Sequence, residues 1–188
     1  MDGSAALKMP EKMGIAEYLE SEMHSEVRHE YRNGYVRAMA GASKNHERVG
    51  GRLFGELYLH LKGSPCEVFK SDMKVLVDVD EQQAFFYPDL VVGCDPADDE
   101  AFYLRQPKLI IEVLSVDEFR DRVEKRLIYQ RLPSLEEYAV VSQDPAKPEV
   151  TVFRRADGWE PAAVHRAGDF ELRSIGFRGR VEDLYPAS

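Results

Sequence analysis

Two carboxylates inside apolar runs, followed by a lysine on a later helix, are the residues best suited to chemistry. Asp89 leads into the apolar run 90–92, and Glu112 interrupts the apolar run 109–114. A carboxylate among apolar residues costs free energy unless a cation, hydrogen bonds or a metal ion compensates it. On neighbouring strands, two such groups would offer a hard divalent cation the oxygen ligands that it prefers. We therefore predict that Asp89 and Glu112 bind a metal ion, with Lys125 beside them.

Each of these residues also has a purely structural interpretation. Asp89 follows a proline, which lacks a backbone donor, and could end a strand and cap a turn. Glu112 could form a buried ion pair with an arginine. Lys125 could form an exposed i,i+4 pair with Asp121. Against this, a strand Asp, a strand Glu and a following Lys suit metal-assisted phosphodiester hydrolysis, in which the ion activates water and the lysine assists.

Three further residues are weaker candidates for the same site. Glu30 lies just before an expected hairpin turn and could supply a third carboxylate. His46 lies in the first turn of an expected helix, where a surface or N-terminal hydrogen-bonding role is the simpler explanation. Lys74 interrupts an apolar alternation and could neutralise a carboxylate on an adjacent strand.

Composition limits the classes of function. The 188 residues suit one domain with a substantial core. The net charge of −9 argues against a protein that coats nucleic acid through its overall charge, although a local basic cleft is compatible with it.

No apolar stretch reaches the length of a membrane span or a signal peptide, so we expect a cytoplasmic protein without membrane contact. Ser-His-Asp, P-loop and Rossmann glycine patterns are absent from the sequence.

The two cysteines, Cys66 and Cys94, do not form a Cys-x-x-Cys motif. We expect both to be reduced and largely buried thiols, in preference to zinc ligands or a structural disulfide.

Hydrophobic periodicity and turn signals predict a single mixed α/β domain over 15–188, with its core at about 15–155, after a flexible segment 1–14. Asn33-Gly34 is a strong hairpin signal. The expected elements are helices at 15–26, 44–61 and 117–131, hairpin strands at 29–32 and 35–40, a long strand at 66–79 bent near Ser71, strands through Asp89 and at 108–115, 137–142 and 149–155, and a small C-terminal β addition with a final turn at 181–185.

Short motifs follow one another in a specific order over roughly residues 15–155. They are Glu30-Tyr31-x-Asn33-Gly34, Ala38-Met39-Ala40-Gly41-Ala42-Ser43, His46, Ser71-Asp72-Met73-Lys74-Val75, Tyr87-Pro88-Asp89, Glu112-Val113-Leu114-Ser115, Asp121-Arg122, Lys125 and Leu132-Pro133-Ser134-Leu135-Glu136-Glu137-Tyr138. Together they resemble the Uma-two family of the restriction-endonuclease-like, PD-(D/E)xK superfamily. The resemblance implies a mixed β-sheet flanked by helices, with Asp89 and Glu112 as Mg²⁺ ligands.

The chain departs from the superfamily pattern at two places. The pattern has a lysine two positions after the glutamate, where this chain has Leu114. The family resembles branches in which that lysine lies on the following helix, which implies Lys125 here. After Ser115, where relatives tend to have Pro-Ser-Thr, this chain has Val116-Asp117-Glu118 and is one residue shorter before Asp121. The change adds negative charge near the site and could shift the helix that carries Lys125.

Three functions are compatible with these observations. We expect a Mg²⁺-dependent endonuclease, with Mn²⁺ as a substitute ion, that acts on DNA as a homodimer so that two sites meet two strands. A catalytically weak nucleic-acid-binding or regulatory module with the same fold is the alternative from another class. A metal-dependent hydrolase of a small phosphoester is the third.

Overall fold

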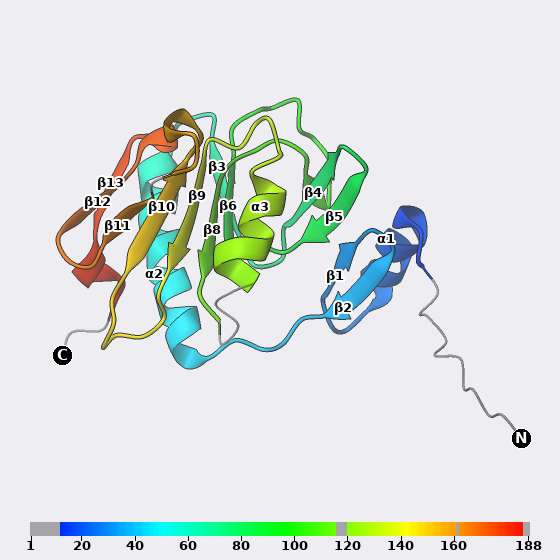
Figure 1. Cartoon of the computed structure of the whole chain (residues 1–188), viewed down its shortest axis with the longest axis horizontal. Helices are drawn as coiled ribbons and strands as arrows, with labels where there is room; N and C mark the ends of the chain where they lie inside the picture. The colour runs from blue at the N-terminus through cyan, green and yellow to red at the C-terminus, as the bar shows by residue number, and fades with distance from the viewer. Residues whose placement is uncertain (1–11, 116–119, 161, 186–188) are drawn as a thin grey trace, which may run out of the picture.

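Two β-sheets with helices packed against them form the body of the protein in the computed structural model, which describes residues 12–115, 120–160 and 162–185 (Figure 1). The described α- and π-helices are α1 (Ile15–His24), α2 (Lys44–Leu61), a π-helical turn (Arg120–Lys125) and α3 (Arg126–Tyr129). The five-stranded sheet has the order β2 (Tyr35–Ala38), β1 (His29–Arg32), β5 (Gln82–Phe86), β4 (Lys74–Val79) and β7 (Tyr103–Leu104). The six-stranded sheet has the order β11 (Ala163–His165), β10 (Val150–Arg154), β9 (Glu137–Val141), β8 (Pro107–Val113), β6 (Leu90–Gly93) and β3 (Glu67–Lys70).

The six-stranded sheet is mixed, as the sequence predicts. Strands β8 and β9 run parallel, and the other neighbouring strands of this sheet are antiparallel. Nearly every residue of β8 is buried, because its apolar run lies at the centre of the sheet with both faces covered. Strand β8 is therefore a rigid support for Glu112.

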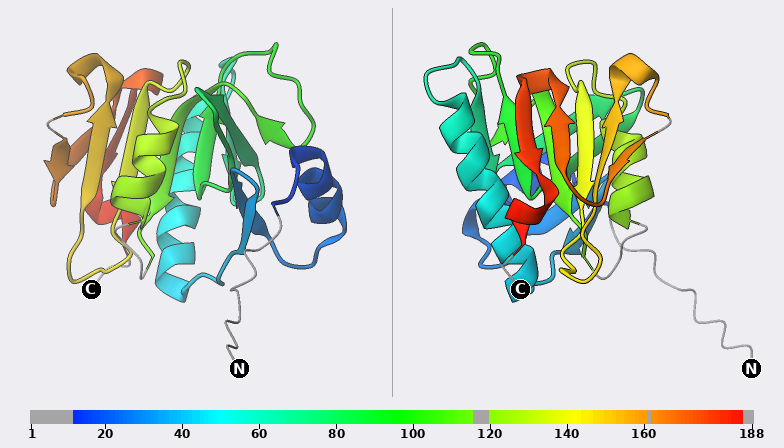
Figure 2. Two further views of the ribbon diagram at one scale, coloured as in Figure 1. Left: turned by 45° about the vertical axis from the view of Figure 1, so that its right-hand side comes forward. Right: turned by 90° about the vertical axis from the view of Figure 1, so that its left-hand side faces the viewer.

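Helices cover both faces of this sheet (Figure 2). On one face, α2 packs its buried residues Val49, Leu53 and Leu57 against the strands, together with the C-terminal hairpin β12 (Asp169–Leu172) and β13 (Phe177–Arg180). On the other face, α3 packs against β8 and β9 together with residues of β4 and β5. The small C-terminal β addition and the final turn (Val181–Leu184) were both predicted and are confirmed.

The N-terminal hairpin also forms where the sequence predicts it. Asn33 and Gly34 connect β1 to β2 with φ angles of 48° and 93°, the left-handed region that favours these two residue types in a tight turn. Helix α1 anchors the hairpin, because Tyr18 packs against Tyr31 of β1 and Phe85 of β5. Of the segment 1–14, residues 1–11 lie outside the described part, and the Met13 amide donates to the Gly34 carbonyl.

The prediction of two continuous strands is wrong. Each of these stretches forms two strands, one in each sheet. The stretch 66–79 is not one bent strand: β3 lies in the six-stranded sheet and β4 in the five-stranded sheet. Ser71 makes the turn between them with a φ of 59°, and its amide donates to the Asp89 carbonyl. The run through Asp89 is likewise divided at 87–89 into β5 and β6. Asp89 therefore lies where the chain crosses between the sheets.

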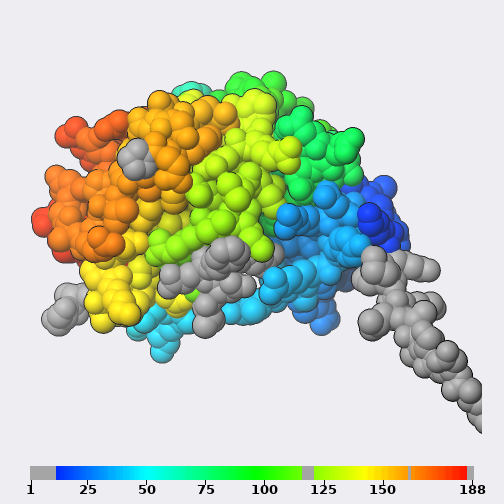
Figure 3. Space-filling model, viewed as in Figure 1, coloured from blue at the N-terminus to red at the C-terminus, as the bar shows by residue number. Residues whose placement is uncertain are grey.

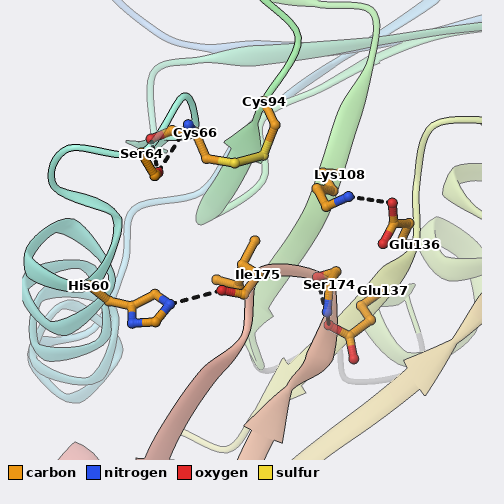
Figure 4. Close-up of a disulfide and its surroundings, with 9 residues drawn as sticks. All are labelled: His60, Ser64, Cys66, Cys94, Lys108, Glu136, Glu137, Ser174 and Ile175. Carbon is orange, nitrogen blue, oxygen red and sulfur yellow. Dashed lines mark hydrogen bonds and ion pairs between the residues drawn. A yellow bond between two sulfur atoms is a disulfide. The ribbon is translucent and has the colours of Figure 1, made fainter.

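The cysteines form a disulfide, so the expectation of two reduced thiols is wrong (Figure 4). The antiparallel pairing of β3 with β6 places Glu67 opposite Gly93, and Cys66 and Cys94 are the next residues on each side. The pairing brings the two side chains together, and two residues 28 positions apart give no sequence signal of it. Within the described residues, every helix is too short or too polar to cross a membrane.

Candidate active site

Asp89 and Glu112 lie side by side because their strands pair. Leu90 of β6 is opposite Ile111 of β8, so the next residues along each strand are Asp89 and Glu112. The Asp89 Oδ2 atom accepts a hydrogen bond of 2.6 Å from the Val113 amide, which fixes the carboxylate against β8. Asp89 directly precedes β6 and Glu112 lies in the neighbouring β8, so the two carboxylates come from adjacent strands, as predicted.

Lys125 is buried against Glu112. Its Nζ atom lies 3.1 Å from Glu112 Oε1 and 3.2 Å from Glu30 Oε1, and both Lys125 and Glu112 are at most 5% exposed. An exposed pair of Lys125 with Asp121 is not found, because Lys125 is buried. A buried ion pair of Glu112 is found, but its cation is Lys125 and not an arginine. Lys125 does lie 3.6 Å from Asp121, but that i,i+4 pair is also buried.

A π-helical turn, Arg120–Lys125, carries the lysine into the site before α3 begins. Single π-turns are rare and often occur at functional sites. The Asp121 Oδ2 atom accepts hydrogen bonds from the Ser115 amide and hydroxyl, and the Asp121 carbonyl accepts one from the Tyr138 hydroxyl. These bonds hold the π-turn to β8 and β9. A regular helix was predicted here, and the predicted departures at 116–118 lie outside the described residues.

His46 reaches Asp89 from the N-terminal turn of α2. Ser43 caps this helix by accepting a hydrogen bond from the His46 amide, and the His46 Nε2 atom lies 3.2 Å from Asp89 Oδ2. Burial acts to lower the pKa of His46, but the hydrogen bond to Asp89 and the charge of that carboxylate outweigh it, so the pKa is raised. The contact with Asp89 therefore favours protonation of His46.

Lys74 is not brought to these residues. Its ammonium lies 5.3 Å from the centre of the Tyr87 ring, and burial lowers its pKa. The residues that meet in one cavity of about 480 Å³ include Glu30, His46, Asp89, Glu112, Asp121 and Lys125.

Negative charge is in excess in this cavity. Five carboxylates line it, against one lysine, one arginine and one histidine. Burial, reinforced by the charges of Asp89 and Asp121 and opposed by Lys125, raises the pKa of Glu112 to about 8. The raised pKa indicates that Lys125 does not fully offset the burial of Glu112 and the charges of the neighbouring carboxylates. A divalent cation would balance these charges, as its own charge reverses the local preference for protonation.

The donor set fits Mg²⁺. Within the described residues, no three His, Cys, Asp or Glu side chains form a ready metal-binding group. Mg²⁺ is usually held by one or two carboxylates and keeps several waters, and the cavity leaves room for them. Asp89 and Glu112 are the pair that would hold the ion.

Comparisons with known proteins show the family to which the chain belongs. The Uma2 family model, described as “Putative restriction endonuclease”, matches residues 15–183. The chain belongs to the Uma2 family. Two proteins of Synechocystis sp. (strain ATCC 27184 / PCC 6803 / Kazusa), slr1290 and sll1609, are each 34% identical to it. The first match covers 93% of this chain and 92% of slr1290, and the second covers 68% of this chain and 73% of sll1609.

A solved structure shares the Uma2 fold seen here. It is described as a “putative nuclease belonging to DUF820” from Anabaena variabilis ATCC 29413, with a TM-score of 0.71 at 16% identity. The match covers 92% of this chain and 97% of that one. The predictions of the Uma-two family and of a mixed α/β, restriction-endonuclease-like fold are therefore confirmed.

Two polar residues of this Uma2 site were not predicted from the sequence. Asp121 was treated as a surface partner of Lys125, although it belongs to the ordered motifs. Gln143 follows β9, where its amide donates to the Leu114 carbonyl at 2.6 Å and its side-chain oxygen accepts from the Ser43 hydroxyl. It thereby joins the start of α2 to the end of β8. A lone glutamine after a strand carries no sequence signal for this role.

Proposed function

We propose that this Uma2 protein is a Mg²⁺-dependent endonuclease that hydrolyses DNA phosphodiester bonds, with Mn²⁺ as a substitute ion. The observation that supports it most is the buried contact between Lys125 and Glu112, next to Asp89, at the wall of an open cavity with excess negative charge. The description of the family as a restriction endonuclease points in the same direction.

Each residue has a distinct role in this proposal. Asp89 and Glu112 hold the ion, which when bound polarises a phosphoryl oxygen and acidifies a water molecule. Lys125 donates a hydrogen bond to the attacking water or to the phosphoryl oxygen, on which negative charge develops. Glu30 and Asp121 hold the Lys125 ammonium in place, and His46 orients Asp89. A homodimer would bring two such sites to the two strands of DNA.

A catalytically weak, DNA-binding module is the second candidate. The net charge of −9 favours it, and so does Asp89, whose Oδ2 atom already contacts the Val113 amide and His46. Both candidates predict DNA binding, but only the first predicts cleavage that depends on the carboxylates.

Nicking of supercoiled plasmid in Mg²⁺ or Mn²⁺ tests the proposal. We expect the wild type to nick DNA and Asp89→Ala to lose at least about 100-fold in rate, because a metal ligand contributes several kcal/mol. Lys125→Ala should also lose most of the activity. The matched controls are Asp78→Ala, an exposed carboxylate on β4, and Lys74→Ala, another buried lysine, and both should cleave as the wild type does.

Full activity in both Asp89→Ala and Lys125→Ala would contradict the proposal. Wild-type protein that binds DNA but leaves it intact in either ion would instead support the second candidate.

A further inference from the structure

One face of the β1–β2 hairpin extends outward from Lys125. Glu30 is opposite Arg37, and Arg32 is opposite Tyr35, so these four side chains lie on the same face. Glu30 contacts Lys125, while the opposite face of the hairpin packs Tyr31 into the protein. We call Arg32, Tyr35 and Arg37 the hairpin ledge. Figure 3 shows the hairpin, in blue, on the same face of the molecule as the yellow-green α3.

The ledge carries positive charge without protein partners. Among the arginine side chains that the structure describes, Arg32 and Arg37 make neither a hydrogen bond nor an ion pair, and both are exposed. This is unexpected in a chain with 34 acidic and 25 basic residues, where the other described arginines contact carboxylates, carbonyl groups or a side-chain amide. The Lys12 ammonium, 5.7 Å from the centre of the Tyr35 ring, adds a third positive charge. The ledge is thus suited to an external anion.

A second cavity of about 200 Å³ lies beside the ledge. Arg32, Tyr35 and Arg37 line it together with Phe86, Ile128 and Lys125. It shares Glu30, Arg37 and Lys125 with the larger cavity, so the two adjoin at the proposed catalytic lysine. Its volume is below the roughly 300 Å³ at which pockets for drug-sized ligands begin. Its three cations outnumber its two carboxylates, Glu30 and Glu124, and its other lining residues are aromatic or apolar. Such a cavity suits one planar ring that carries phosphates.

We propose that the hairpin ledge binds one unpaired nucleotide next to the phosphate that is cleaved. The base enters the smaller cavity and stacks on Tyr35, while Arg37 and Arg32 contact the phosphates on either side of its sugar. A base within an intact duplex must first be unstacked and unpaired, which costs a few kcal/mol, whereas an unpaired base can enter without that cost. The substrate class is therefore DNA with a single-stranded segment. This inference rests on the proposed endonuclease function, whose cleaved phosphate defines the position of the ledge.

Binding without cleavage tests the ledge. Fluorescence anisotropy in Mg²⁺ would compare the full-length Glu112→Gln protein with a short oligothymidylate and with a duplex of equal length. We expect tighter binding of the single strand. In that background Tyr35→Ala should weaken single-strand binding by roughly 5- to 100-fold through lost stacking. Combining Arg32→Ala with Arg37→Ala should reduce the slope of log affinity against log salt by about 1.4, or about 0.7 for each phosphate contact.

Matched controls come from exposed residues elsewhere. Tyr58→Ala on α2 removes an exposed tyrosine, and Arg178→Ala with Arg180→Ala removes two exposed arginines from β13. Neither should change affinity or salt slope as the ledge variants do. Equal effects of ledge and control variants, or preferred binding of the duplex, would overturn the inference.

The two proposals fail in different ways. Plasmid cleavage by a protein whose ledge variants bind like the controls would leave the nuclease proposal intact and contradict the ledge. Loss of single-strand binding in the ledge variants of a protein that cleaves nothing would support the ledge as a binding surface and contradict the nuclease.

Discussion

Replacing Glu112 with glutamine is expected to lower the rate of metal-dependent DNA cleavage by about 10³-fold. The amide has nearly the shape of the carboxylate but lacks its charge, so the proposed ion loses one anionic ligand. A loss of about 4 kcal/mol of transition-state stabilisation corresponds to this factor. Initial rates of plasmid nicking measure it, with Glu136→Gln, an exposed glutamate paired with Lys108, as the control.

The same variant should fold at least as well as the wild type, because Lys125 keeps its contacts with Glu30 and Asp121. The pKa of Glu112 is raised to about 8 in the folded protein, chiefly by burial. In the unfolded chain it is near 4.3. The folded state therefore holds the extra proton between these pH values, and its stability falls as the pH rises towards 8, by at most about 1.4 kcal/mol per pH unit.

In EDTA, urea unfolding at pH 5 and pH 8 should show this loss of stability in the wild type and a smaller one in Glu112→Gln. If the variant is strongly destabilised and its stability depends on pH as the wild type's does, Glu112 is instead part of a structural ion pair.

Replacing Arg154 with methionine is expected to reduce the free energy of unfolding by about 3–5 kcal/mol, the largest effect on stability that we predict. Arg154 Nε donates to Glu137 Oε1 at 2.8 Å, and both side chains are buried. Ser174 also donates to the Glu137 carboxylate through its amide and its hydroxyl (Figure 4). The Arg173 amide donates to the same carboxylate. The cluster fastens the C-terminal β addition to β9. Without the arginine, a buried carboxylate loses its only cation among the described residues.

Urea unfolding measures this change, and Arg131→Met is the matched control. Arg131 forms an exposed pair with Asp80, which should contribute less than about 1 kcal/mol. Cleavage per folded molecule should be unchanged in Arg154→Met, because Glu137 and Arg154 do not line the proposed active site. Equal stability of the two variants would show that the buried pair contributes little.

Local signals in the sequence were sufficient for much of the fold. The Asn33-Gly34 turn and the apolar periodicity of α2 each depend on residues close together in the chain, so hairpin and helix appear where predicted. The division of the stretch 66–79 between two sheets depends on Ser71 in a left-handed conformation and on distant pairing partners. The Cys66–Cys94 bond likewise depends on the pairing of β3 with β6.

The candidate site was also predictable only in part. Asp89 and Glu112 stand out because a charge within an apolar run needs compensation, and the structure places them together. The burial of Lys125 and the part taken by Asp121 depend on a π-turn, and a turn with one additional residue has no distinctive periodicity. Lys74 breaks an apolar alternation as Glu112 does, but its ammonium lies over the Tyr87 ring and Lys74 does not line the cavity. A charged residue within an apolar run thus indicates that some compensating group is needed, but it does not identify that group.

Diffraction from crystals soaked in Mn²⁺ tests the central claim most directly. The proposed metal site predicts an anomalous peak in contact with both the Asp89 and the Glu112 carboxylates, with the Lys125 ammonium nearby, and no such peak in crystals of Asp89→Ala. A peak elsewhere, for example at the acidic loop 95–100, with none between Asp89 and Glu112 would contradict it.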